Sequence, residues 1–322
     1  MPTPPRANGR SEARTGILAG VAAYAIWGTF PIYFHLLAPA GPLEILCHRI
    51  LWSLVVMLVV VSFRRDWAWI RPLLSDRRRL LELAVAAVLI ATNWLLYVWA
   101  VEQDRVVDAA LGYFINPLVT VTLGVVVLGE RLRRAQWIAV ALGALAVVVI
   151  AVGYGQFPTV ALTLAFSFAG YGFLKKRITL TPVQSLTGET AILAPFAVVA
   201  LGYVIATEGT AFATEGWGLS ALLATTGIVT ALPLVLFAAS ARRIPLTVLG
   251  LLQYLTPSLQ FLCGVFVFHE SMPAERWAGF ALVWIALMFM SADALHQLRS
   301  PGPDEPPSTV DEVVAAATPE LG

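Results

Sequence analysis

Ten continuous apolar stretches run along the chain, separated by short segments rich in charged residues, Gly and Pro. Strands of a membrane barrel would alternate polar and apolar residues, whereas these stretches are apolar throughout. Each is about 20 residues long, the length at which an α-helix crosses roughly 30 Å of hydrocarbon. The pattern therefore predicts spans over residues 16–37, 42–63, 80–101, 106–129, 135–153, 158–175, 184–206, 217–241, 246–268 and 275–296.

Composition agrees with a chain that lies mostly in lipid. Hydrophobic residues make up 58% of it and charged residues 13%, against about 25% charged in a typical soluble domain. The expected fold is thus an all-α membrane protein, multi-pass in the cell membrane, with the lipid bilayer as a partner. A net charge of +1 gives no reason to expect a nucleic-acid partner. The two cysteines, Cys47 and Cys263, fall within apolar stretches, so we expect neither a disulfide framework nor a zinc cluster. No metal and no cofactor are predicted.

The basic residues fix the expected orientation. With the amino terminus inside, 18 of the 21 Lys and Arg residues fall in the terminal segments and loops of that side. Only Arg105 and Arg276 fall outside, and Arg49 lies within a span. Because cytoplasmic loops attract Lys and Arg, both termini are predicted to be cytoplasmic. Residues 1–15 form a cytoplasmic segment, and the Pro-rich, acidic tail 297–322 is predicted to be disordered and cytoplasmic.

The two halves of the chain resemble each other. At an offset of 140 residues, Pro117 meets Pro257, Glu130 meets Glu270 and Gly, Trp, Ala and Leu positions also coincide. Earlier in each half the offset drifts to 145, which pairs Glu44 with Glu189. An offset of five spans, an odd number, makes the second copy enter the membrane from the opposite side. We therefore expect two inverted five-helix repeats, residues 16–153 and 158–296, an architecture typical of secondary transporters.

Three ionisable residues stand close together within the second span: Glu44, His48 and Arg49. Arg49 lies about 10 Å from the predicted outer end of the helix, too deep to reach water easily, so it should face the bundle. Glu44 and His48 are one turn apart on one helix face. Either Arg49 binds an anionic group of a substrate, or Glu44 and His48 carry a coupling proton, or the three form an internal ion-pair network.

Uncharged polar residues cluster before two prolines that the repeat aligns, Pro117 and Pro257. A proline within a helix frees a carbonyl one turn earlier, and such a carbonyl is tolerated at membrane depth where it faces a cavity. Matching prolines therefore indicate a binding site or its gates. The predicted substrate-binding residues are Arg49, His48, Glu44, Asn93, Tyr97, Tyr113, Asn116, Gln253 and Tyr254, with Pro117 and Pro257 as gating or kink positions; no catalytic residue is predicted.

Several strings make the likeness to a known family specific. They are AYAIWGTFPIYF (23–34), LEILCHRILWS (43–53), TNWLLYVWAV (92–101), LGYFINPLV (111–119), LGERLRRAQW (128–137), LAFSFAGYGFLKK (164–176) and LGLLQYLTPSLQFL (249–262). Through residues 14–297 the chain resembles the RarD family, in the EamA branch of the drug/metabolite transporter superfamily. The resemblance implies ten helices, cytoplasmic termini and a permease of small molecules, in a family whose physiological substrate is poorly defined.

The leading hypothesis is a secondary transporter that moves small metabolites or amphipathic drugs by alternating access, with proton coupling left open. An ATP-driven pump within this chain is excluded, because its two lysines, Lys175 and Lys176, follow Leu174 and not the Gly of a Walker loop. The alternative is an integral-membrane enzyme that modifies lipid with the cluster of Glu44, His48 and Arg49. Against the enzyme, no metalloprotease or nucleophile-elbow motif occurs. Oligomeric state, substrate and direction stay open.

Overall fold

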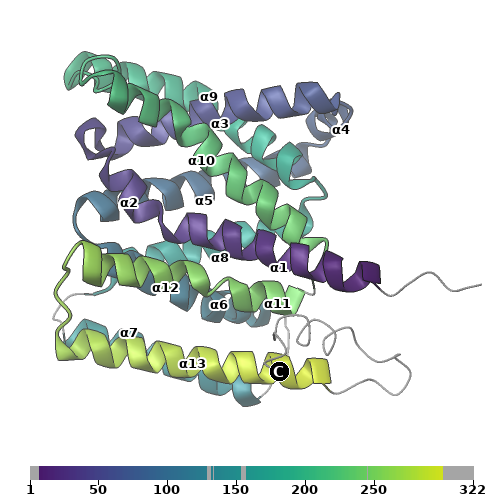
Figure 1. Ribbon diagram of the computed structural model, residues 1–322, viewed down its shortest axis with the longest axis vertical. Coiled ribbons are helices and arrows are strands. Elements are labelled where there is room, and N and C mark those ends of the chain that lie inside the picture. Colours follow the sequence, from purple (N-terminus) through teal and green to yellow (C-terminus); the bar gives the residue numbers. More distant parts are fainter. Residues whose placement is uncertain (1–6, 129–131, 133, 154–156, 245, 300–322) are drawn as a thin grey trace, which may run out of the picture.

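The computed structural model describes residues 7–128, 132, 134–153, 157–244 and 246–299, which form a bundle of helices without a strand. The long helices lie side by side and run between the same two ends of the molecule (Figure 1). We call the end at which α1 begins the amino-terminal end, and the end at which α3 begins the Glu44 end. The tail from residue 300 and the repeat position Glu130 lie outside the described residues.

Local sequence rules set several helix starts in the first half. The Asp76 side chain accepts hydrogen bonds from the backbone N–H groups of Arg78 and Arg79 and so caps α5. Pro42, in the first turn of α3, needs no N–H partner there. The elements are α1 (Ala7–Gly28), α2 (Phe30–His35), the 3-10 helix η1 (Ala38–Ala40), α3 (Gly41–Arg64), α4 (Ile70–Ser75), α5 (Arg77–Glu102), α6 (Val106–Leu128) and α7 (Arg134–Gly153).

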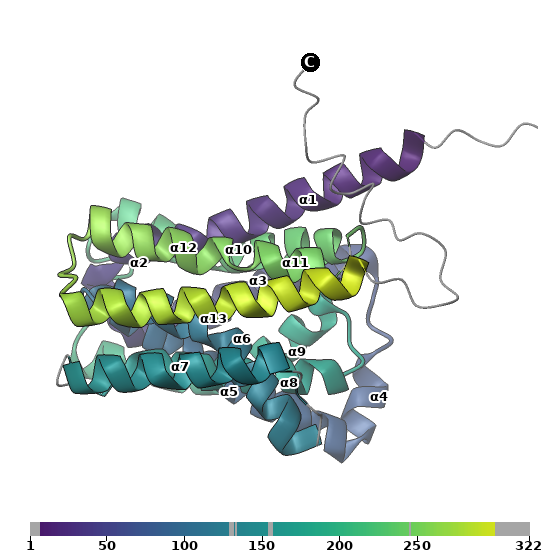
Figure 2. The same ribbon diagram turned by 90° about the horizontal axis from the view of Figure 1, so that it is seen from below.

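The second half follows the same order of long helices. Thr181 and Gln184 form a reciprocal capping box at the start of α9. The elements are α8 (Thr159–Arg177), α9 (Pro182–Thr207), α10 (Trp217–Ala241), α11 (Leu246–Leu252), α12 (Leu255–Leu262), the π-helical turn η2 (Cys263–Val267) and α13 (Ala274–Arg299). Helices α7 and α13 pair at one edge of the bundle, and α3 and α9 pair at the opposite edge (Figures 1 and 2).

The predicted class is confirmed. Within the described residues, nine helical stretches are long and apolar enough to cross a membrane. A further apolar helix, Thr159–Lys175, is shorter. Lipid-exposed large hydrophobic side chains are frequent on the outer helices, as in Phe196 of α9. The tenth crossing and the inverted relation of the halves stay predictions.

The first predicted span is broken in two. Helix α1 ends at Gly28, and α2 starts at Phe30 with Pro31 in its first turn. Pro31 has no N–H, so the carbonyl of Trp27, one turn earlier, is free of its usual helical partner. The side-chain Nε2 of Gln260, on α12, donates to that carbonyl at 3.2 Å. The break thus ties the first span to the ninth.

The two aligned prolines behave differently. Helix α6 runs unbroken through Pro117. In the second half the helix is interrupted at Gln253 and Tyr254, which separate α11 from α12, and Pro257 follows in the first turn of α12. Both halves therefore have the aligned proline, but only the second half has an interruption of the helix before it.

Helices α3 and α10 approach closely beside the polar residues of α3. A Cβ atom added to Gly227 would lie 2.4 Å from both the carbonyl carbon and the carbonyl oxygen of Trp52. Any larger residue would force the two backbones apart. The absent side chain therefore lets α10 bring its hydroxyl groups, Thr226 and Thr230, against α3.

Candidate functional site

Arg49 lies deep inside the bundle. It is eight residues from the first residue of α3 and fifteen from the last, about 12 and 22 Å along the helix axis. Its exposed fraction is 4%. Its Nε donates to the Thr230 hydroxyl of α10 at 3.0 Å. Among the described residues this is its one hydrogen bond, and no carboxylate lies within ion-pair distance. A buried guanidinium is therefore left without a counter-charge in this part of the chain.

Aromatic rings replace the missing counter-charge. The guanidinium carbon of Arg49 lies 4.1 Å from the ring centre of Trp94 on α5, 5.3 Å from that of Phe34 and 5.6 Å from that of Phe30, both on α2. Ring faces attract a cation, by about 2 kcal/mol or more when it is desolvated. A charged residue at the centre of a spanning helix costs about 2.5 to 3.5 kcal/mol on insertion scales. The rings therefore offset much of the cost of burying the charge.

Three tyrosines complete the surroundings of the guanidinium. Tyr33, Tyr97 and Tyr113 lie close enough to Arg49 to interact with it electrostatically. The Tyr33 hydroxyl donates to the Leu222 carbonyl at 2.7 Å. The Tyr113 hydroxyl donates to Asn93 at 3.0 Å. The Tyr97 hydroxyl is buried and has no hydrogen-bond partner among the described residues. We call these three tyrosines with Arg49, Thr230, Phe30, Phe34 and Trp94 the Arg49 site.

Asn93 joins the first half to the second. Its amide group donates to the carbonyl of Leu164 at 3.1 Å and to the hydroxyl of Ser167 at 3.0 Å, both on α8. With the bond from Tyr113, all of its polar atoms are partnered. Asn93 therefore holds α8 and the Tyr113 ring in place beside the Arg49 site, and its own atoms are not open to a ligand in this state.

Glu44 does not contact Arg49 but binds the loop between α9 and α10. Its carboxylate accepts hydrogen bonds from the N–H of Ala211 at 3.0 Å, the N–H of Phe212 at 3.1 Å and the hydroxyl of Thr210. Charge-assisted bonds of this kind are about twice as strong as neutral ones. The residue predicted to bind substrate or a proton thus fastens a loop 166 positions away to the start of α3.

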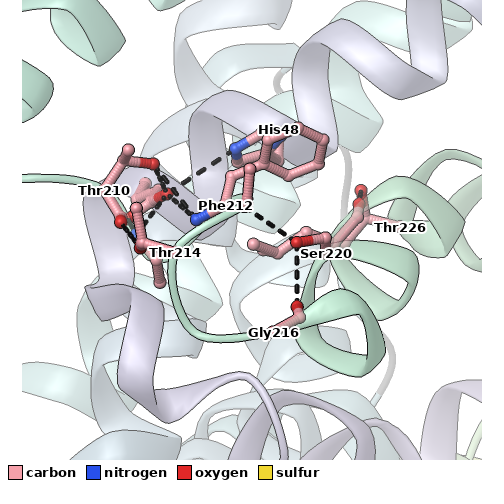
Figure 3. Close-up of polar contacts among 11 residues, drawn as sticks. His48, Thr210, Phe212, Thr214, Gly216, Ser220 and Thr226 are labelled. Atoms are coloured by element: carbon pink, nitrogen blue, oxygen red, sulfur yellow. Dashed lines mark hydrogen bonds and ion pairs between the residues drawn. The ribbon is translucent and has the colours of Figure 1, made fainter.

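His48 covers the same loop. Its ring stacks on Phe212, with centres 4.8 Å apart, and its Nε2 lies 3.7 Å from the Glu44 carboxylate, beyond hydrogen-bond distance (Figure 3). On the other side of the loop the N–H of Ala213, in the left-handed region at φ 66°, donates to the Ser220 hydroxyl at 2.8 Å. Glu44, His48 and Ser220 therefore fix the loop 208–216 from two helices.

Glu189, which the repeat aligns with Glu44, has different partners. Its carboxylate lies 2.8 Å from the ammonium of Lys175 and accepts hydrogen bonds from Ser185 at 2.7 Å and Tyr171 at 3.2 Å. These partners are all side chains of α8 and α9, the sixth and seventh predicted spans. The two aligned carboxylates thus face opposite ends of the bundle, one bound to backbone amides and the other to a lysine.

A second buried arginine lies at the Glu44 end. Arg276 contacts Asp108 of α6 at 3.0 Å and lies 4.0 Å from Glu270. Arg105 also pairs with Asp108, at 2.8 Å. The Glu270 carboxylate accepts hydrogen bonds from the first two backbone N–H groups of α6, those of Val106 and Val107. Burial raises the pKa of Glu270 to about 7, although those amides and Arg276 favour its charged form.

The other predicted residues spread around the Arg49 site without joining it. Asn116 is buried, one turn along α6 from Tyr113, and its side-chain oxygen has no partner among the described residues. Tyr254 packs with the α6, α7 and α13 cluster and interacts with Ser291 of α13. Gln253 has no side-chain partner in the part of the chain that the structure describes. Sequence reasoning missed Thr230, Phe30 and Phe34, because only the way α10 and α2 pack brings them to Arg49. It also missed the contact of Gln260 with the Trp27 carbonyl, which depends on how α12 packs against α1.

The chain is similar to known membrane transporters. The family model described as "EamA-like transporter family" matches residues 14–152. The chain is 52% identical over 292 residues to Protein RarD of Streptomyces exfoliatus, covering 90% of this chain and 92% of the relative. It is 42% identical to Protein RarD of Escherichia coli, covering 89% and 97%, and 41% identical to the uncharacterized transporter YojE of Bacillus subtilis, covering 90% and 98%. One crystal structure shares the fold, with a TM-score of 0.56 at 16% identity over 87% of this chain and 98% of its own.

The fold and these relatives define a multi-pass membrane transporter of the drug/metabolite transporter superfamily, and not an enzyme. Within that class, the chain belongs to the RarD family of EamA-type transporters.

Proposed function

We propose that the protein is a secondary transporter that carries small metabolites or amphipathic drugs across the cell membrane by alternating access, with the Arg49 site as its substrate site. The observation that carries the proposal is the buried guanidinium of Arg49, which lies about a third of the way along a spanning helix without a carboxylate partner among the described residues. Intramembrane charges generally mark substrate or ion pathways. Side chains from α2, α3, α5, α6 and α10 surround it.

The proposal includes ten spans in two inverted repeats, residues 16–153 and 158–296, with both termini cytoplasmic. The pattern of helix contacts supports it. In the proposed repeats α1, α3, α5 and α6 correspond to α8, α9, α10 and α12. A contact between two helices should then recur between their counterparts. The pair α1 and α10 has the counterpart α8 and α5, the pair α1 and α12 has α8 and α6, and the pair α3 and α10 has α9 and α5; all six pairs are in contact. Two near-equivalent halves can exchange conformations and so expose a central site alternately to each side.

Tyr97 and Tyr113 belong to the proposed site. Asn93 supports it by holding the Tyr113 ring in place, and Asn116 flanks it one turn further along α6. Gln253 and Tyr254 have a different proposed part. They form the interruption between α11 and α12, where a helix can change direction most easily. We assign these two residues and the prolines Pro117 and Pro257 to the movement that opens the site.

Proton coupling, the finer part of the proposal, falls on Glu44 and His48. Protonating the Glu44 carboxylate removes the charge that the Thr210 hydroxyl and two loop amides bind, so the loop between α9 and α10 is released. The nearby His48 ring, 3.7 Å away, is the group with which that proton can be exchanged. Accumulation in proteoliposomes should then stop when the pH gradient is collapsed; undiminished accumulation removes the proton and leaves exchange or another ion.

Flux into proteoliposomes of purified protein tests the transport proposal. A mixture of small molecules extracted from cells supplies the probes, and mass spectrometry of the vesicle interior identifies those that enter. Entry that saturates with concentration and disappears in Arg49→Ala, while Ser53→Ala on the next turn of α3 transports normally, is the expected result. If Arg49→Ala, folded and inserted, gives wild-type flux, the Arg49 site is not the substrate site.

A further inference from the structure

We propose that the Arg49 site binds a single carboxylate group, so that the transported molecules are organic monoanions; this rests on the proposed transport function. The inference starts from the free atoms of Arg49. Its Nε is occupied by Thr230, which leaves Nη1 and Nη2 as the donors without a protein partner among the described residues. These two nitrogens lie on the end of the planar guanidinium.

The end of a guanidinium is matched to a planar carboxylate. Nη1 and Nη2 can donate two parallel hydrogen bonds to its two oxygens, the bidentate geometry in which Arg binds carboxylates most strongly. The rings of Trp94, Phe34 and Phe30 lie about the same group and limit its movement. The donors are therefore held in one orientation before a ligand arrives, which lowers the entropy lost on binding.

A second unused donor lies in the same surroundings. The Tyr97 hydroxyl is buried, with the residue 3% exposed, and has no partner among the described residues. Tyr97 lies within electrostatic range of Arg49, and its ring is 5.8 Å from that of Tyr113, which is also near Arg49. A buried hydroxyl without a partner is unfavourable, so a ligand that accepts its hydrogen bond is favoured. An oxyanion that lay between Arg49 and Tyr97 could accept from both.

The charge of the surroundings limits the ligand to one negative charge. The other paired cations among the described residues lie at the ends of the bundle. Arg105 and Arg276 are at the Glu44 end, and those at the amino-terminal end are Arg78, Arg79, Lys175, Arg177 and Arg243. A dianion such as a phosphate monoester would bring one charge with no counter-charge into an apolar interior. A cation would meet Arg49 as a like charge. Both are disfavoured by the cost of an unpaired buried charge.

The experiment reads the charge and chemistry of what the protein moves. Proteoliposomes of wild type, Arg49→Gln, Arg49→Lys and the control Ser53→Ala are incubated with a cell extract below about 1 kDa, and the lumen is analysed by mass spectrometry. Molecules that enter through wild type and Ser53→Ala should carry one carboxylate and a net charge of −1. Their entry should fall about 100-fold or more in Arg49→Gln. It should fall about 10-fold in Arg49→Lys, which keeps the charge but loses the two parallel donors of the guanidinium.

A matched series then separates the anion types. The primary amide, the sulfonate and the phosphate monoester of the best carboxylate are compared with the acid itself, and the acid should enter fastest. If the molecules that enter are neutral, cationic or dianionic, transport stands and the carboxylate assignment is wrong. If nothing enters through correctly inserted wild-type protein, the transport proposal itself fails. Equal thermal midpoints of the four proteins show that lost entry does not reflect unfolding.

Discussion

Two buried arginines, Arg49 and Arg276, have opposite surroundings. They are 4% and 7% exposed. Arg276 lies at the Glu44 end against two carboxylates, whereas Arg49 lies in the middle of the bundle against a hydroxyl and three aromatic rings. A charge that is paired inside the protein has no need of a ligand, and a charge that is not paired does. The contrast separates an arginine whose charge is paired within the protein from one whose Nη1 and Nη2 have no partner among the described residues, as the proposed substrate site requires.

The two regions also differ in what they connect. Arg276 of α13 joins Asp108 of α6, and Glu270 caps α6, so these bonds cross between the last span and the first half. At the same end Glu44 fastens the loop between α9 and α10. Carboxylates therefore tie helices and a loop together at this end, while Nη1 and Nη2 of Arg49 have no partner among the described residues. The difference leads to four predictions, taken from the largest effect to the smallest.

Arg276→Met should give the largest loss of stability. It leaves Asp108 with Arg105 as its remaining charged partner and Glu270 without its nearby cation. Breaking a buried ion pair from one side costs about 3 to 5 kcal/mol, which here corresponds to a thermal midpoint lower by roughly 5 to 10 °C. Thermal unfolding in detergent measures it. An unchanged midpoint would show that Arg276 is no more structural than Arg49.

Arg49→Met should have the reverse profile. Because the variant removes an unpaired charge and keeps a long apolar side chain among the rings, its thermal midpoint should equal or exceed that of the wild type. Its flux in proteoliposomes should fall about 100-fold or more. The Ser53→Ala protein, altered one turn away on α3, serves as the control for both measurements. A variant that unfolds easily would put Arg49 in the same structural class as Arg276.

The pH dependence of stability should isolate Glu270. In the folded protein its pKa is raised to about 7, above the ordinary value of 4.5, so the folded state binds more protons between these values. The contribution of this raised pKa to the free energy of unfolding is fully present below pH 4.5 and is lost as the pH rises towards and through 7. The difference in unfolding free energy between wild type and Glu270→Gln should therefore change by about 2 kcal/mol between pH 5 and 7. Parallel pH profiles of the thermal midpoint would contradict the assignment.

Thr230→Val should have the smallest effect. It removes the hydroxyl that accepts from Nε of Arg49 but keeps the shape of the side chain. A hydrogen bond to a charged group contributes about 1.5 to 3 kcal/mol, and at the lower end of that range the KM for entry should rise roughly 10-fold with little change in folding. Thr226→Val, one turn earlier on α10, is the matched control, since its hydroxyl donates to the Leu223 carbonyl. Equal KM values for the two variants would remove Thr230 from the site.

The sequence alone predicts the helices well, because lipid requires long apolar segments and these are visible in any one chain. The predicted start of the fourth span at Val106 and the buried position of Arg49 both agree with the structure. Arg49 could be placed because depth follows from distance along a helix. Glu44 could not be assigned its loop partners, because those amides belong to a segment whose position depends on how α9 and α10 pack.

The breaks in the helices were only partly predictable. Pro31, Pro117 and Pro257 have the same local effect, which is the loss of one N–H, yet the helix stays continuous at Pro117. At Pro31 the freed Trp27 carbonyl finds Gln260 on another helix. The loss of one N–H therefore does not by itself decide whether a proline ends a helix, and a single sequence does not show how the freed carbonyl is partnered.

Because Gly227 has no side chain, the packing of α3 against α10 is sensitive to the addition of a single carbon atom. A methyl group there would collide with the Trp52 carbonyl and act as a wedge only one turn from Thr230. Alanine at this position would move the hydroxyl of α10 away from the guanidinium without touching any charge. The size of the residue at position 227 therefore determines how closely the Thr230 hydroxyl approaches the buried guanidinium.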